Sequence, residues 1–414
     1  MSSPITDLSI AKPLTLKCGL TLPNRLVKSA MAEKMADARG LPTKKLDAVY
    51  SEWANGGWGL ILTGNVQVDA NYLGQPGDVS VDTSNADLLS SWKRYANASR
   101  TGKTPVIMQI NHPGRQSPLG AGKRSLFAKA LAPSPIPMNM GDGFIAKMAV
   151  RILFGTPKEM TEEDIKTVVS QFATAARLAA ESGFDGVEVH AAHGYLLSTF
   201  LTATTNRRTD KYGGSPSNRA RIVVEIIEAV RNVVPKSFCI GLKLNSADLH
   251  SAGELEDSIE QIRCIEKAGI DFLEISGGSY ENPRMMGADF DGSKPSSRTA
   301  AREATFIDFA EAIRSDFPRL LLLVTGGFRT RSGMEAAVSG SACDLVGIAR
   351  PAVLQPKLPN EIIFNDAVPN EKARLPEKKV AVPFFAKFSG LKGVGAGVSN
   401  NWYTGELQKI GQAK

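Results

Sequence analysis

The sequence predicts an α/β protein built as a closed (β/α)8 TIM barrel with a C-terminal extension. Short apolar runs typical of buried parallel strands alternate with longer amphipathic segments typical of helices. Eight such runs occur, which is the number that this barrel requires. No run is followed directly by Gly-x-Gly-x-x-Gly and a helix, so the open, doubly wound dinucleotide fold is the lesser alternative.

The expected elements follow in chain order. The strands are residues 25–30, 59–63, 106–110, 186–190, 238–244, 272–276, 320–325 and 345–349. The helices between them are residues 44–55, 85–101, 161–182, 218–233, 254–268, 304–317 and 332–338. Thr161 with Asp164 three residues later predicts a capped helix start, and Gly183 and Gly269 are typical helix stops.

The alternation of strands and helices ends near Asp366, in a stretch rich in Pro, Lys and Gly. We therefore expect residues 1–365 to form the barrel and residues 366–414 to form a tail. The glycine-rich segment 393–397 lies in this tail without a preceding strand, and we interpret it as a loop. The tail is expected to pack on the barrel or on a neighbouring subunit of a homo-oligomer.

Composition and charge exclude several classes of function. The chain has 414 residues, 43% of them hydrophobic and 22% charged, as in ordinary globular proteins. Its net charge of +7 includes no long basic run with interleaved aromatics, so no nucleic-acid partner is expected. The longest aliphatic run, 320–324, is too short to span a membrane, and residues 1–12 lack the pattern of a secretory signal. We expect a cytoplasmic protein with small-molecule partners.

The four cysteines, Cys18, Cys239, Cys264 and Cys343, are far apart and form no Cys-x-x-Cys pair. This spacing argues against a cysteine-ligated iron-sulfur cluster, a structural zinc and a disulfide framework. Reduced, buried thiols and no bound metal are therefore expected.

Polar residues at the carboxyl ends of the expected strands are the candidate site, because barrels place their reactive groups there. His190, His193 and Tyr195 follow the fourth strand. Two imidazoles can donate hydrogen bonds to a carbonyl oxygen as it gains negative charge, and a phenol can supply a proton. These roles suit addition to a conjugated carbonyl. Structural histidines and a His-x-x-His metal site are the alternatives, although no third ligand with suitable spacing is evident.

Other strands contribute further candidates. Gln109 is an amide inside an apolar strand, and a heteroaromatic ring edge would satisfy its hydrogen bonds; a glutamine tolerated by packing is the alternative. Lys243 lies within the fifth strand, and a buried cation implies an anionic or electron-accepting partner. Segments 325–329 (TGGFR) and 347–351 (GIARP) end the last two strands, which is a recurrent place for a phosphate site in barrels.

Together these residues resemble the Old Yellow Enzyme family of FMN-dependent NAD(P)H:flavin oxidoreductases and ene-reductases. The resemblance covers roughly residues 10–360, and its motifs lie on the strands in the expected order. The motifs are 22–25 (LPNR) with 29–31 (SAM), Gln109 with 112–116 (HPGRQ), 190–196 (HAAHGYL), 206–215 (NRRTDKYGGS) with 218–219 (NR), 274–278 (EISGG), 325–327 (TGG) and 349–350 (AR).

The resemblance implies FMN bound over the barrel mouth and NAD(P)H as a transient reductant that uses the pocket of the second substrate. It implies that His190 and His193 hold the carbonyl oxygen of the substrate. Tyr195 would protonate the carbon alpha to that carbonyl after hydride reaches the beta carbon. The implied FMN contacts are Ala30, Met31 and Gly64 on the isoalloxazine, Gln109 on its pyrimidine edge, Lys243 at N1 and O2, and Gly326, Gly327, Ala349 and Arg350 on the phosphate.

The sequence departs from the family pattern at three places. Lys243 stands where most members have arginine, which keeps the charge and loses the bidentate fork. Ala32 stands where many members have a cysteine or threonine that adjusts the flavin. The segment 137–157 is longer than the family minimum and is expected to be a loop that caps the active site and shapes substrate choice.

The sequence thus predicts an FMN-dependent oxidoreductase that takes hydride from NAD(P)H and reduces the C=C bond of an α,β-unsaturated ketone or aldehyde. A flavin-dependent isomerase or dehydrogenase of a biosynthetic pathway is the alternative on the same fold. A flavin- or ligand-binding barrel with little turnover is a second alternative, against which the intact set of His190, His193 and Tyr195 argues. A metal-dependent barrel hydrolase is the third.

Overall fold

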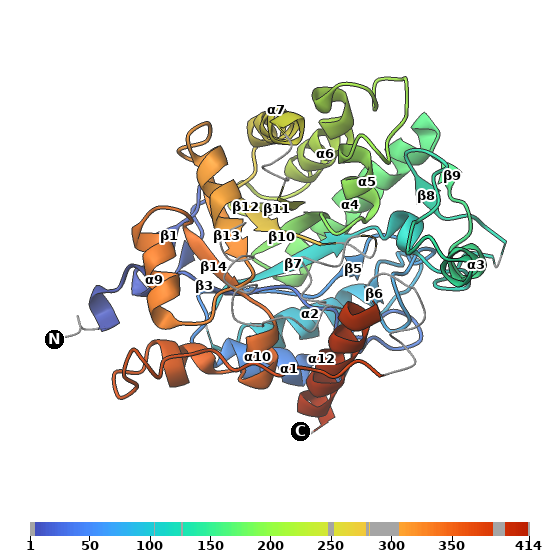
Figure 1. Cartoon of the computed structure of the whole chain (residues 1–414). Helices are drawn as coiled ribbons and strands as arrows, with labels where there is room; N and C mark the ends of the chain where they lie inside the picture. The colour runs from blue at the N-terminus through green and yellow to red at the C-terminus, as the bar shows by residue number, and fades with distance from the viewer. Residues whose placement is uncertain are drawn as a thin grey trace.

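The computed structural model describes residues 5–102, 104–125, 127–246, 252–278, 281, 306–383 and 394–412. Within it, eight parallel strands close a barrel that helices surround (Figure 1). In chain order they are β3 (Leu26–Lys28), β4 (Leu60–Leu62), β7 (Val106–Asn111), β10 (Gly186–Ala191), β11 (Cys239–Asn245), β12 (Phe272–Ser276), β13 (Leu321–Thr325) and β14 (Leu345–Ile348). Strand β14 pairs with β3, and this pairing closes the barrel. The predicted fold class and all eight predicted strands are confirmed.

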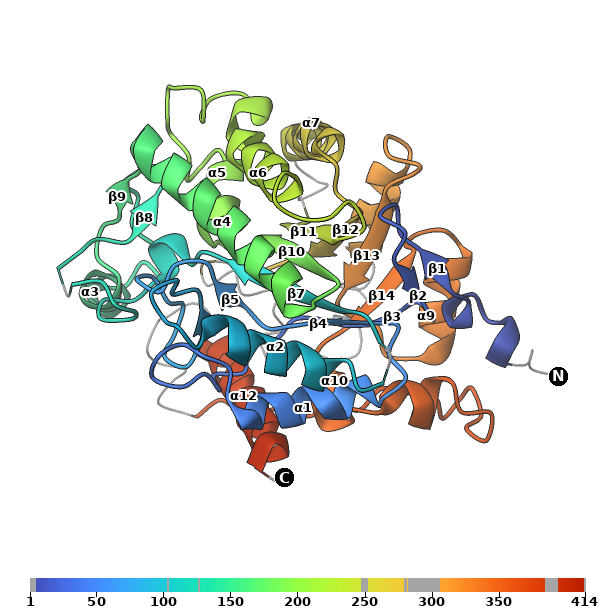
Figure 2. The same ribbon diagram turned by 180° about the vertical axis from the view of Figure 1, so that it is seen from behind.

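The helices predicted between the strands are also present. They are α1 (Lys44–Ala54), α2 (Leu88–Ser99), α4 (Glu162–Ser182), α6 (Pro216–Arg231), α7 (Ala252–Ala268) and α9 (Arg331–Ser339). Residues 306–314 are helical too, whereas the first two residues of the predicted helix 304–317 lie outside the described part of the chain. Thr161 and Asp164 form the predicted capping box of α4, and Gly183 ends this helix with a φ of +95°. Figure 2 shows α1, α2 and α4 side by side on one outer face.

Apolar side chains fill the amino-terminal half of the barrel. They come from seven of the eight barrel strands and are Val27, Leu60, Leu62, Ile107, Cys239, Phe272, Leu323 and Leu345. Leu16 and Leu22 pack on this cluster from the hairpin of β1 (Leu14–Thr15) and β2 (Thr21–Leu22), which closes that end. The carboxyl end of the barrel is therefore the one that can hold a ligand.

The strand register sets which polar side chains face the barrel interior above this cluster. Gln109 lies opposite Glu188 in the β7–β10 pair, and Lys243 lies opposite Glu274 in the β11–β12 pair. Because side chains two apart on a strand share a face, His190 lies one step above Glu188 on the same face of β10. The polar interior thus follows from the alternation of side chains between the two faces of each strand.

Two segments differ from the expectation. Residues 394–397, predicted as part of a loop, begin helix α12 (Val394–Gln412), whereas Gly393 lies outside the described residues. The segment 137–157, predicted as a loop, contains α3 (Phe144–Leu153). Helix α12 packs against α1 and α10 (Arg350–Leu354) (Figure 1). Its Leu407 is fully buried. Burial against α1 outweighs the low helix propensity of its glycines, which is why composition misleads here.

The cysteines are free, as expected, but only Cys239 and Cys343 are buried. Cys18 and Cys264 are half-buried, so the expectation of four buried thiols is wrong for these two. No helix within the described ranges is long and apolar enough to cross a lipid bilayer.

Candidate active site

A cavity of about 580 Å³ opens at the carboxyl ends of the barrel strands. It brings together most of the residues singled out in the sequence, namely Ala30, Met31, Gln109, His190, His193, Tyr195, Lys243, Ala349 and Arg350. Gly64, Gly326 and Gly327 are not among its lining residues, although they follow the barrel strands β4 and β13.

A left-handed turn after β10 brings the two histidines and the tyrosine together. His193 and Gly194 have φ values of +61° and +76°, which is uncommon for a residue other than glycine. The rings of His190 and His193 lie 4.9 Å apart between centroids, and those of His190 and Tyr195 also lie 4.9 Å apart. Asn245 on β11 accepts a hydrogen bond of 3.1 Å from the His193 backbone N–H and so fixes this turn.

Both imidazoles are neutral. Burial lowers the pKa of His193 to about 3, with the positive charge of Lys243 as a lesser cause. Burial also lowers the pKa of His190 far below its usual value. The His190 Nδ1 accepts a hydrogen bond of 3.2 Å from the Ala192 N–H, so its Nε2 carries the proton. The His193 Nε2 lies 3.1 Å from the Ser276 Oγ. The pair can therefore donate hydrogen bonds to a ligand without carrying charge.

The phenol of Tyr195 is positioned from the other side of the cavity. The Asn65 Nδ2 donates a hydrogen bond of 3.3 Å to the Tyr195 Oη. Asn65 itself lines the cavity, three residues after the end of β4. Asn65 therefore holds the phenol oxygen beside the histidines.

The floor of the cavity is a buried polar cluster. The Gln109 Nε2 donates a hydrogen bond of 2.5 Å to Glu188, and the Lys243 Nζ forms an ion pair of 2.7 Å with Glu274. The expected anionic partner of Lys243 is thus found within the chain itself. Burial and the adjacent charge of Glu274 raise the pKa of Glu188 well above its usual value.

Sequence reasoning missed Glu188 and Glu274 as neighbours of the site. Strand parity was the available signal, because Glu188 is two residues before His190, and Glu274 is two residues before Ser276. Side chains at these spacings share the inward face of the barrel.

The lining side chains fit FMN. Of the lining residues that the structure describes, Lys34, Lys243 and Arg350 are cations and none is Asp or Glu. Arg350 suits a phosphate, Gln109 suits the donors and acceptors of a pyrimidine edge, and Ala30 and Met31 offer an apolar surface to a flat ring.

Glycine is required at two predicted FMN contacts for different reasons. A side chain at Gly64 would lie 2.1 Å from the Glu33 Oε2, and its N–H donates a hydrogen bond of 2.9 Å to the Glu33 Oε1. Gly327 has a φ of +84°, which favours glycine. Its neighbour Gly326 follows β13, which pairs with β14, so the two predicted phosphate loops are adjacent.

Helix α12 also lines the cavity, and no local pattern in the sequence indicates this. Its lining residues are Val394, Ala396, Gly397, Asn400, Asn401 and Thr404. The Arg350 Nη2 donates a hydrogen bond of 3.3 Å to the Asn400 Oδ1, and the Thr404 Oγ1 donates one of 3.1 Å to the Ala32 carbonyl. The tail is therefore part of the site.

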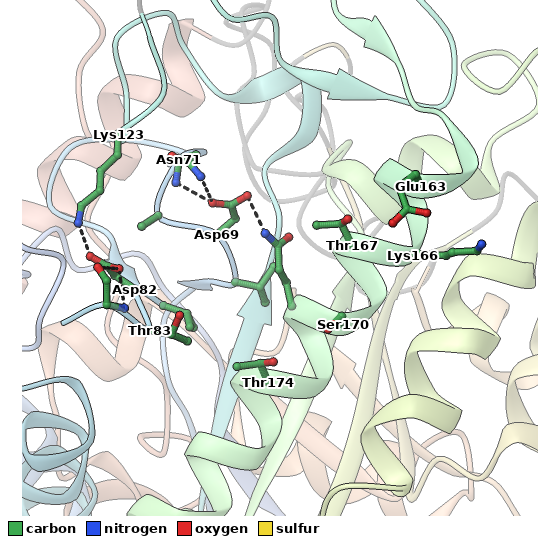
Figure 3. Close-up of a pocket in the computed structure, with 15 residues that line it drawn as sticks. Asp69, Asn71, Asp82, Thr83, Lys123, Glu163, Lys166, Thr167, Ser170 and Thr174 are labelled. Atoms are coloured by element: carbon green, nitrogen blue, oxygen red, sulfur yellow. Dashed lines mark hydrogen bonds and ion pairs between the residues drawn. The ribbon is translucent and has the colours of Figure 1, made fainter. Parts of the chain in front are cut away.

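A second cavity, of about 600 Å³, lies outside the barrel between the loops around residues 69–84 and helix α4 (Figure 3). Asp82 forms an ion pair with Lys123 there, and Asp69 accepts a hydrogen bond of 2.8 Å from Gln171. Glu163 and Lys166 on α4 also line this cavity. None of the predicted site residues lines it. The barrel mouth is thus the candidate active site.

A (β/α)8 barrel whose mouth combines an FMN-compatible lining with two imidazoles and a phenol defines a flavin-dependent oxidoreductase of the barrel class. Residues 9–365 match the model of the NADH:flavin oxidoreductase / NADH oxidase family, and the chain belongs to that family. FMN is the cofactor and NAD(P)H the reductant, so the predicted family, enzyme class and cofactors are confirmed.

Two fungal relatives are similar to most of this chain. The NADH-dependent flavin oxidoreductase iccE of Talaromyces variabilis is 49% identical over 415 residues, which cover 98% of this chain and 99% of that relative. The NADH-dependent flavin oxidoreductase iliE of Neonectria sp. (strain DH2) is 51% identical over 414 residues, which cover 96% of this chain. The match covers 54% of the Neonectria protein, so this chain spans about half the length of that relative.

Among solved structures, an old yellow enzyme homologue from Zymomonas mobilis has the same fold. It matches 90% of this chain and 94% of its own with a TM-score of 0.70 at 22% sequence identity.

Proposed function

We propose that this protein reduces the C=C bond of α,β-unsaturated carbonyl compounds with NADH as the source of hydride. The observation that carries this proposal is the convergence of two neutral imidazoles and a phenol over one cavity, with ring centroids 4.9 Å apart. The names of the relatives at 49% and 51% identity, which are NADH-dependent, support NADH as the reductant.

Each residue has a defined task in this reaction. Bound FMN supplies the hydride to the beta carbon of the alkene. His190 and His193 donate hydrogen bonds to the carbonyl oxygen and stabilise the negative charge that develops there. Because both are neutral, they act as dipolar donors rather than as counter-ions. Tyr195 gives its phenolic proton to the alpha carbon, and Asn65 keeps the phenol oxygen in place.

The cavity wall supports an apolar substrate. Its outer part is formed by residues of α3 and the segments next to it, namely Met140, Ala149, Val150, Leu153 and Phe154. These residues belong to segment 137–157, much of which is the helix α3, and their place in the cavity lining supports the prediction that this segment caps the site. We propose that this wall selects among alkenes by shape and apolar contact.

The test begins with the visible spectrum of the purified protein, in which bound FMN gives its own bands. FMN-saturated protein is then mixed anaerobically with NADH and 2-cyclohexenone. We expect one cyclohexanone for each NADH oxidised. If no cyclohexanone forms and NADH is oxidised only after oxygen is admitted, alkene reduction is rejected. Migration of the double bond without NADH consumption would assign an isomerase instead.

A further inference from the structure

We propose that Lys34, held by Asn401 of helix α12, forms a binding subsite for an anionic oxygen group at the mouth of the cavity, occupied by the diphosphate of NADH during flavin reduction. This inference rests on the proposed function only in taking NADH as the reductant. A carboxylate on the oxidising substrate shares the same chemistry, and the experiment below separates the two sources.

The cations that line the cavity exceed those that FMN requires. Lys243 is paired with Glu274 at 2.7 Å on the cavity floor. Arg350 stands at the predicted phosphate position, directly after Ala349 at the end of β14. Lys34 is the third lining cation, and FMN has a single phosphate. The anion that Lys34 attracts must therefore come from a second ligand.

The ammonium of Lys34 is oriented but not neutralised. Its Nζ donates a hydrogen bond of 2.8 Å to the Asn401 Oδ1, which is an uncharged acceptor. Within the described part of the chain, no carboxylate pairs with this ammonium. An ammonium has three donors, so Lys34 can keep Asn401 and still bind an anionic oxygen.

The backbone of Lys34 is held in an unfavourable conformation. Its φ is +55°, in the left-handed region that residues with a side chain rarely adopt. Gln408 donates a hydrogen bond of 3.3 Å to the Lys34 carbonyl, and a side chain at Gly77 would lie 3.0 Å from that carbonyl. Strained residues persist where the surrounding structure imposes them, and they concentrate at ligand sites.

One face of α12 provides this support. Asn401, Thr404 and Gln408 are spaced by three and four residues, so they lie on the same face of the helix. In that order they contact the Lys34 side chain, the Ala32 carbonyl and the carbonyls of Glu33 and Lys34. Helix α12 thus stabilises segment 32–34, and these contacts explain why the tail packs beside the active site.

The diphosphate of NADH fits this position. Lys243, Gln109 and the histidines occupy the floor and centre of the barrel mouth, where the nicotinamide must meet the flavin. The rest of the dinucleotide must then leave through the mouth, and its first charged group is the diphosphate. Gln75 lines the same cavity and adds an amide donor for the phosphate oxygens.

The test compares two reductants in anaerobic stopped flow on FMN-saturated protein. NADH carries the diphosphate, whereas 1-benzyl-1,4-dihydronicotinamide has the same reacting ring without it. For Lys34→Met we expect the Kd of NADH to rise roughly 10- to 100-fold, because a charge-assisted hydrogen bond is lost. The limiting rate of reduction and the Kd of the benzyl analogue should stay unchanged. Lys34→Arg, which keeps the charge, should bind NADH nearly as the wild type does.

Matched variants control for charge and folding. Lys44→Met removes the same charge from an exposed position at the start of α1 and should leave both reductants unaffected. Asn401→Ala removes the exposed amide that orients Lys34 and should weaken NADH binding by a smaller factor, so it tests the subsite even if Lys34→Met fails to fold.

Three outcomes would overturn the inference. Equal weakening of both reductants would show that Lys34 acts on the nicotinamide or the flavin, and a lower FMN affinity would assign it to the cofactor phosphate. In the third outcome, Lys34→Met binds NADH as the wild type does and loses affinity for 4-oxo-2-pentenoate, which has a carboxylate, but not for 2-cyclohexenone. This result would assign the subsite to a substrate carboxylate. Since flavin reduction is measured without alkene, failure of the proposed alkene chemistry would not affect these results.

Discussion

Tyr195 differs from the two histidines in the half-reaction that it should affect. In the proposed alkene reduction the phenol is needed only when the alpha carbon takes up a proton, whereas NADH delivers hydride without a protein acid. Tyr195→Phe should therefore retain FMN and normal reduction by NADH, while alkene reduction slows by roughly 10²- to 10⁴-fold. Stopped-flow measurement of the two half-reactions checks this, and equal slowing of both would reject the role of Tyr195 as the acid.

The histidine pair can be tested with a ligand that does not react. Phenols should bind to the oxidised enzyme as phenolates held by His190 and His193, with a long-wavelength charge-transfer band. Because the pKa of His193 is lowered to about 3 and that of His190 is far below its usual value, neither imidazole changes charge near neutral pH. Phenol affinity should therefore rise with pH until the phenol itself is ionised. His193→Ala should weaken binding by about 1 to 3 kcal/mol, and an undiminished band would place the pair elsewhere.

Side chains that point into the barrel from β7, β10, β11 and β12 form one polar cluster on the cavity floor, which contains Gln109, Glu188, Lys243 and Glu274. Within this cluster the cation Lys243 and the carboxylate Glu274 form an ion pair, so their two formal charges offset each other beneath the predicted flavin site. Glu274→Gln leaves the charge of Lys243 uncompensated, and a cation stabilises the reduced flavin more than the oxidised one. The two-electron midpoint potential should rise by about 20 to 60 mV, which corresponds to about 1 to 3 kcal/mol.

Dye equilibration on FMN-saturated protein measures this potential. The double variant Lys243→Met with Glu274→Gln removes both charges and should return close to the wild-type value. A potential that stays constant or falls in Glu274→Gln would place Lys243 away from the flavin.

Helix α12 should be an integral part of the fold. Leu407 is fully buried where α12 packs on the barrel, so Leu407→Ala should lower the free energy of unfolding by about 2 to 5 kcal/mol. Lys409 is exposed on the same helix and forms only a surface ion pair with Glu406, so Lys409→Ala should change stability by about 0.5 kcal/mol or less. Urea unfolding of the FMN-saturated proteins compares them, and equal small effects would mean that α12 is not docked in solution.

The elements that the sequence predicted well are those whose pattern is local. Each barrel strand is a short apolar run, and Thr161 with Gly183 marks both ends of α4. Helix α12 could not be predicted in this way, because its glycines lower helix propensity and its stability depends on contacts with α1, which is some 350 residues earlier in the chain.

Closure of the barrel creates contacts that no local pattern contains. Cys18 and Cys239 belong to a hairpin and a strand far apart in sequence, yet their sulfurs and the Asp271 carboxylate lie within 4.8 Å of one another. The same closure brings Asn65 to Tyr195. The catalytic candidates could be predicted because they sit at strand ends in recognisable motifs, whereas the residues that orient them could not, since these come from other strands and from α12.

Two of the four histidines in the chain, His112 and His190, are buried, and His193 is half-buried. Burial lowers the pKa of His112 from 6.5 to about 4, and the charge of Asp69 opposes this shift only in part. In the unfolded chain His112 takes up a proton below pH 6.5, while in the folded protein it remains neutral down to about pH 4. The contribution of His112 to the free energy of unfolding is therefore complete above pH 6.5, and it is lost as the pH falls from 6.5 to about 4.

At pH 5 this loss amounts to about 2 kcal/mol for one such histidine, from the difference between 5 and an unfolded pKa of 6.5. His112 lies outside the cavity lining, so His112→Asn can test the effect without disturbing the site. The variant has no group to protonate at this position, and asparagine can still accept the hydrogen bond of the Gly114 N–H. The free energy of unfolding is measured in urea with saturating FMN at pH 8 and at pH 5. Its decrease between these two pH values should be about 2 kcal/mol smaller in the variant than in the wild type. An identical fall in both proteins would mean that His112 is already protonated in the folded state at pH 5.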